Sequence, residues 1–180
     1  HVAIFLVDGQ SQQVKLAAMA GSLERAFPSH HALRIGQGLV GSVCTSRQII
    51  LANDVLLEPR YVNQFPERIP TKAELCLPIL IGDELVGVLD LQSPTINAFD
   101  EQDVRTMEAV SRQLAVAIEN ARLYEEAQVR IQDRERAEKL MRLQRDLLAE
   151  LSSPTDLSHA LNLILQTLVR VDGITGGCIY

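Results

Sequence analysis

The chain has 180 residues, of which 47% are apolar, 22% charged and 4% aromatic, and this balance excludes a disordered tail. Its 17 basic and 23 acidic side chains leave a net charge of −6, and no stretch concentrates Lys and Arg, so we expect no nucleic acid partner. No apolar run approaches the ~18 residues that cross a bilayer, so we expect a cytoplasmic chain without membrane contact.

The first part of the chain predicts short strands around one short helix. Residues 39–46 form that helix, because their apolar positions share one face. Asn53 and Asp54 offer capping oxygens to a further helix from about Val55, which Pro59 interrupts. The β-branched and alternating runs that predict strands are residues 2–7, 14–19, 33–35 and 49–51.

Two longer apolar segments follow, at residues 74–81 and 85–93, and they predict a hairpin. Glycine at the start of Gly82-Asp83-Glu84 suits a type II′ turn between them. Asp100 then caps a helix, and Asp103 three residues later completes a capping box of reduced strength.

That helix has no stop signal for about fifty residues, because the next Gly or Pro is Pro154. A helix over residues 101–151 is ~75 Å long at ~1.5 Å per residue, which exceeds the diameter of a small domain. Its second half carries an apolar stripe that needs another helix to cover it, so we expect a homodimer through this helix. The stripe consists of Ala137, Leu140, Met141, Leu147, Leu148 and Leu151.

Short motifs follow one another along residues 1–125, namely Gly38-Leu39-Val40-Gly41-Ser42-Val43, Asn53-Asp54, Pro59-Arg60-Tyr61, Glu74-Leu75-Cys76-Leu77-Pro78-Ile79, Gly87-Val88-Leu89-Asp90-Leu91, Phe99-Asp100 and Ala117-Ile118-Glu119-Asn120-Ala121-Arg122-Leu123-Tyr124. Their order and spacing resemble a GAF domain. The resemblance implies an α+β fold of the GAF/PAS-like type, an antiparallel β-sheet with flanking helices, here continued by a long coiled-coil-type helix. It also implies a ligand pocket between short helices, loops and the central strands.

The chain departs from the family pattern at both ends. A GAF domain usually has a helix before its first strand, whereas this chain starts at the strand, and we expect a piece of a longer protein. Residues 154–180 resemble the first helix and strand of a second GAF domain, because Gly177-Cys178-Ile179-Tyr180 matches Val2-Ala3-Ile4-Phe5. The predicted parts are a GAF domain at 1–125, a signalling and dimerisation helix at 101–151, and the second domain's start at 154–180.

The residues show no catalytic apparatus. One GAF group reduces free methionine sulfoxide with a reactive cysteine in the loop before the Glu74-type strand, but residues 64–73 contain no Cys. The three widely spaced cysteines lack a Cys-x-x-Cys pair, and the adjacent His30 and His31 cannot easily aim both rings at one ion, so we expect no metal site. A thiol enzyme similar to the free methionine sulfoxide reductases stays as the remote alternative.

The pocket that the resemblance implies has predicted ligand-binding residues on the short helix, after the fourth short strand, and on the strand at 74–81. Asp54 is also explained as a helix cap and Tyr61 as a wedge that holds its loop. The predicted residues are Leu39, Val43, Cys44, Leu51, Asn53, Asp54, Tyr61 and Cys76.

The resemblance therefore predicts a sensory module of a bacterial-type signal-transduction protein, such as a sensor histidine kinase of a two-component system. A small-molecule effector in the pocket would bias the dimeric helix that leads to the next domain. The alternative function is a GAF domain that binds nothing and serves as a dimerisation spacer.

Overall fold

The computed structural model describes residues 1–21, 31–63, 70–151 and 157–169. The chain divides into two compact units, residues 1–121 and 122–180, and the long helix contributes to both. The helices and strands are β1 (Val2–Asp8), β2 (Gln13–Ala20), β3 (Ala32–Arg34), α1 (Gly38–Ser46), β4 (Ile50–Ala52), the 3₁₀ turn η1 (Val55–Leu57), β5 (Ala73–Ile81), β6 (Glu84–Ser93), α2 (Glu101–Leu151) and α3 (Leu157–Val169).

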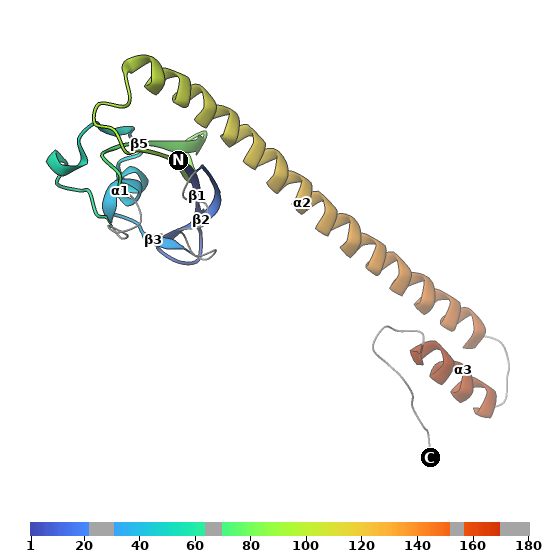
Figure 1. The fold of residues 1–180 in the computed structure, drawn as a ribbon. Helices are drawn as coiled ribbons and strands as arrows, with labels where there is room; N and C mark the ends of the chain where they lie inside the picture. The colour runs from blue at the N-terminus through green and yellow to red at the C-terminus, as the bar shows by residue number, and fades with distance from the viewer. Residues whose placement is uncertain (22–30, 64–69, 152–156, 170–180) are drawn as a thin grey trace. The chain divides into compact units, whose positions relative to one another are not determined.

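The strands form one six-stranded antiparallel sheet in the order β3-β2-β1-β6-β5-β4 (Figure 1). This confirms the predicted antiparallel sheet and its flanking helices. The hairpin turn is also as predicted. Ile81 pairs with Glu84 across a two-residue turn, and Gly82 has a φ of +57°. Asp83 has no positive φ, which distinguishes type II′ from type I′.

Each face of the sheet is covered by a different helix. Alternation along β5 sends Leu75, Leu77 and Ile79 to one face, where the first part of α2 packs on them. Cys76 points to the opposite face and joins the cluster that α1 covers. We call these the α2 face and the α1 face.

One local difference from the sequence prediction concerns a helix. The helix expected from Val55 is the single turn η1, since the residue before Pro59 is disfavoured in helical geometry. Asp54 caps this turn by accepting a hydrogen bond from the Leu56 amide at 3.0 Å. The 51-residue helix α2 is as predicted. At its start, Asp100 Oδ1 accepts from the Asp103 amide at 2.8 Å, and Asp103 Oδ2 accepts from the Asp100 amide at 2.9 Å.

Pro78 lies within β5 beyond the reach of β4. The three residues of β4 pair with Glu74, Leu75 and Cys76, so the described part of β4 stops short of the proline. The carbonyl of Pro78 accepts a hydrogen bond of 2.6 Å from the hydroxyl of Ser111, which is buried on α2. The bond ties the sheet to α2.

The second unit contains the remainder of α2 and α3. Helix α3 (Leu157–Val169) lies in the segment 154–180 that resembles the start of a second GAF domain. The rest of that segment, residues 154–156 and 170–180, lies outside the described residues, so the second GAF domain stays a prediction. No described helix is both long enough and apolar enough to cross a membrane.

Candidate ligand pocket

A cavity of about 70 Å³ lies on the α1 face, beside the start of α1. Its walls come from β1, β2, β3, the start of α1 and the segment Tyr61–Asn63, and its floor comes from β5 and β6. A buried water needs about 10–15 Å³ by the same measure, so the cavity has room for a few waters or a compact ligand. The apolar side chains along it are Ala3, Phe5, Met19, Leu33, Leu39 and Val40.

The floor of the cavity is polar because acidic and amide side chains replace apolar ones at facing positions of two paired strands. Glu74 in β5 lies opposite Gln92 in β6, and Cys76 lies opposite Asp90. Period-two alternation puts all four side chains on the α1 face. Glu74 and Asp90 are 5% and 2% exposed, respectively, so both carboxyl groups are withdrawn from bulk water.

A chain of hydrogen bonds fixes this floor. The Thr71 hydroxyl donates to Gln92 Oε1 at 2.6 Å, and Gln92 Nε2 donates to Asp90 Oδ2 at 2.7 Å. The Cys76 thiol lies between the acids, with Sγ 3.3 Å from Glu74 Oε1 and 3.5 Å from Asp90 Oδ1. Asp90 Oδ2 is thereby held by the side-chain amide of Gln92, while Asp90 Oδ1 faces the Cys76 thiol.

Burial dominates the electrostatics of the floor. It raises the pKa of Asp90 to about 6, although the bond from Gln92 works in the opposite direction. Burial and the negative charge of Asp90 raise the pKa of Glu74 well above its usual range. The pKa of the Cys76 thiol is raised by burial and by both acids. Among the described residues that line the cavity, no Lys or Arg side chain offsets the negative charge of Glu74 and Asp90.

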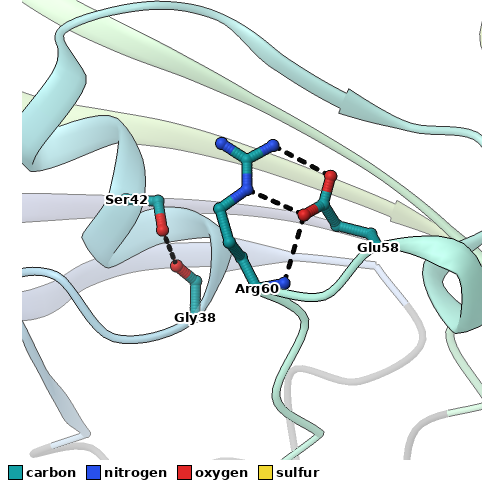
Figure 2. A network of polar contacts seen from close by, with 4 residues as sticks. All are labelled: Gly38, Ser42, Glu58 and Arg60. Atoms are coloured by element: carbon teal, nitrogen blue, oxygen red, sulfur yellow. Dashed lines mark hydrogen bonds and ion pairs between the residues drawn. The ribbon is translucent and has the colours of Figure 1, made fainter.

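The segment that carries Tyr61 is held by a local ion pair (Figure 2). The Arg60 guanidinium makes two bonds to the Glu58 carboxylate, at 2.7 and 2.9 Å, and holds the pKa of Glu58 below its usual range. On α1, Ser42 donates to the Gly38 carbonyl at 2.7 Å. Figure 2 shows both contacts, and each lies within a segment that borders the cavity.

Of the predicted ligand-binding residues, Leu39 and Tyr61 line the cavity. Val43 and Cys44 are buried residues of α1 and belong to the same hydrophobic cluster as Cys76. Whether these residues bind a ligand stays a prediction. The thiol of Cys76 contacts both acids of the cavity floor.

The other predicted residues lie elsewhere. Leu51 and Asn53 border a separate depression next to the start of α2. The Asn53 amide donates to the Phe99 carbonyl at 2.8 Å and accepts from the Phe99 amide at 3.2 Å, which joins the end of β4 to the segment before α2. Asp54 acts as the cap of η1. These contacts give both polar side chains structural partners.

Sequence reasoning missed Glu74, Asp90, Gln92 and Thr71 as cavity residues. A signal for two of them was present, because Glu74 and Asp90 are charged residues within otherwise apolar strands. Such residues are almost never fully buried unless they have polar partners. The turn at Gly82 predicts the pairing of β5 with β6, but Glu74 and Asp90 share one face only because the register shifts between Ile79 and Leu80, and the sequence pattern does not indicate that shift.

The comparisons with known proteins agree with this architecture. Protein YtsP of Bacillus subtilis is 29% identical over 98 residues, which cover 52% of this chain and 56% of YtsP, so the match spans little more than half of that relative. The GAF domain of a phosphoenolpyruvate-protein phosphotransferase from Coxiella burnetii is 27% identical with a TM-score of 0.62, over 68% of this chain and 73% of that one.

A further solved structure has the same fold. The free methionine-R-sulfoxide reductase of Neisseria meningitidis, in complex with its substrate, is 22% identical with a TM-score of 0.58 and covers 68% of each chain. The family model for the GAF domain matches residues 1–119, which include the whole sheet, the cavity and the start of α2. This chain belongs to the GAF domain family.

Proposed function

We propose that this chain is a regulatory GAF module that binds a small-molecule effector in the cavity beside α1 and passes the effect to α2. The cavity carries the proposal, because apolar walls with a few oriented polar groups are the usual composition of a small-molecule site. Its volume of about 70 Å³ favours a compact effector. We place the module in a cytoplasmic signalling protein, such as a two-component sensor kinase.

The two faces of β5 and β6 offer a short route from the cavity to α2. Glu74 and Asp90 form the floor of the cavity, while the neighbouring Leu75 and Leu89 pack in the cluster that α2 covers. An effector that moves the cavity floor therefore acts on β5 and β6, and α2 packs on the opposite face of these strands. A shift in the position of α2 would carry the signal.

The second half of α2 supports a dimer. Leu140, Met141 and Leu148 are 60%, 62% and 58% exposed, respectively, although each is large and apolar. Their spacing places them along one stripe of the helix, and burial against a second helix would stabilise the assembly. We propose that this stripe joins two copies of the chain.

Native mass spectrometry and a thermal-shift screen of cell metabolites test the effector. We expect a bound small molecule, or a compound that raises the melting temperature by mass action. Val40→Trp, which fills the cavity wall, should abolish that effect. Val116→Trp, at an exposed position of α2, is the matched control and should retain it. A wild-type chain that binds none of the screened compounds would favour the spacer.

Light scattering tests the dimer. Leu140→Glu puts a charge into the stripe and should produce monomers at micromolar concentration. Ala149→Glu adds the same charge on the opposite side of α2 and should leave the dimer intact. A wild-type chain that is monomeric at high micromolar concentration would contradict this part of the proposal.

Two alternatives remain distinct from an effector-binding module. A dimerisation spacer that binds no effector would keep the light-scattering result and lose the thermal shift. A thiol enzyme is less well supported. Cys44 and Cys76 are both buried, and burial raises the pKa of Cys44 to about 11, which disfavours the reactive thiolate. Cys178 lies outside the described residues.

A further inference from the structure

The floor of the cavity brings together side chains of the kinds that bind transition metals. Glu74 in β5 lies opposite Gln92 in β6. His1, just before β1, lies on the other side of Gln92, because the backbone N–H of Gln92 donates to the His1 carbonyl at 2.9 Å. On the same face, Cys76 lies opposite Asp90. Sheet pairing, not spacing along the sequence, thus assembles a carboxylate, a thiol, a second carboxylate and an imidazole.

The distances between three of these groups fit one metal ion. One ligand atom from each of Glu74, Cys76 and Asp90 lies within 4.8 Å of the other two. The two contacts of the Cys76 sulfur with carboxylate oxygens are 3.3 and 3.5 Å. In a tetrahedral site with Zn–S near 2.3 Å and Zn–O near 2.0 Å, sulfur and oxygen ligands are separated by about 3.5 Å.

One of these ligands is already oriented by its neighbours. Gln92 holds Asp90 Oδ2 at 2.7 Å, and Thr71 holds Gln92 at 2.6 Å, which leaves Asp90 Oδ1 directed at the thiol. Outer hydrogen bonds of this kind orient carboxylate ligands in protein metal sites. The arrangement needs no rearrangement of the strand to present that oxygen.

An independent observation points to a ligand in the same cavity. His1 lies along the cavity with Glu74 and Asp90. Its Nε2 atom is buried and has no hydrogen-bond partner among the described residues. A buried polar atom without a partner is rare in proteins and is commonly explained by an ion or water. Imidazole nitrogen is also a preferred ligand of zinc.

We propose that Glu74, Cys76 and Asp90 bind a divalent transition-metal cation of the zinc type. The imidazole of His1 lines the same cavity but lies outside this group of three, and we propose that it turns toward the cation as the fourth ligand. Binding displaces the thiol proton and any carboxyl proton of the pair to solvent, so that one thiolate and two carboxylates face the cation. This site goes beyond the proposed effector function and can exist without it. Metal uptake and metabolite binding are measured separately, which keeps the two proposals distinguishable.

Titration of the metal-free chain with Co²⁺ tests the site, because a cobalt–thiolate bond gives an intense charge-transfer band in the near ultraviolet. We expect this band at one Co²⁺ per chain and its displacement by Zn²⁺. Cys76→Ser should abolish it. Cys44→Ser removes another buried thiol, on α1, and should leave the band unchanged.

Two further variants test the site even if Cys76→Ser fails to fold. Asp90→Asn and His1→Ala should each lower the affinity for Co²⁺ by at least about tenfold. A wild-type chain without the band, or a band that a folded Cys76→Ser variant retains, would overturn the site. An unchanged affinity in His1→Ala would overturn the assignment of the fourth ligand.

Discussion

Asp90 should make the stability of this domain depend on pH between about 4 and about 6. Burial raises its pKa from the ordinary value of 3.8 to about 6 in the folded chain. The folded state therefore binds a proton that the unfolded state releases. The stabilisation that the protonated Asp90 carboxyl provides is fully present below pH 3.8 and is lost as the pH rises through about 6.

The size of the effect follows from the change in pKa. One pKa unit corresponds to about 1.4 kcal/mol, so the change from 3.8 to about 6 corresponds to about 3 kcal/mol of unfolding free energy. Asp90→Asn removes the titrating group and keeps a similar shape. Asp90→Asn also removes the negative charge that raises the pKa of Glu74. This second change likewise makes the stability of the wild type fall relative to the variant as the pH rises.

Urea unfolding of the wild type and Asp90→Asn between pH 4 and pH 7, with EDTA present, measures the effect. The stability of the wild type relative to the variant should fall by about 2–3 kcal/mol across this range, because the unfolded carboxyl is already partly ionised at pH 4. Asp83→Asn, in the exposed turn between β5 and β6, controls for the loss of a surface carboxylate. A difference between wild type and Asp90→Asn that stays constant with pH would refute the reasoning.

Substitutions at three positions test the packing and the helix start. Leu77→Ala removes a fully buried side chain between β5 and α2 and should cost about 2–5 kcal/mol in urea unfolding. Asp100→Ala removes the cap of α2 and should cost about 1 kcal/mol in a thermal melt, whereas Asp100→Asn should cost less. Gly41→Ala places a Cβ atom 2.5 Å from the Arg34 carbonyl oxygen, and the resulting overpacking should cost about 1–3 kcal/mol in urea unfolding. Wild-type stability in any of the three alanine variants would contradict the corresponding contact.

Local signals predicted the elements of the fold, because each depends on a few neighbouring residues. Gly82 determines its turn through its own φ, and Asp100 caps α2 through amides two and three residues away. The cavity floor depends instead on the register shift between Ile79 and Leu80 within the predicted β5–β6 hairpin, which the local pattern does not encode. Asn53 illustrates the same limit, since its amide bonds to Phe99, 46 positions away in the sequence.

The position of Pro78 affects how the domain resists aggregation. An unpaired strand edge presents backbone donors and acceptors on which a strand from another molecule can grow. Pro78 has no amide hydrogen to offer, and Ser111 already occupies its carbonyl oxygen. The part of β5 that extends past β4 is therefore a poor template at this residue. Substitution of Pro78 by a β-branched residue would restore a donor and create a site for edge-to-edge association between copies of the domain.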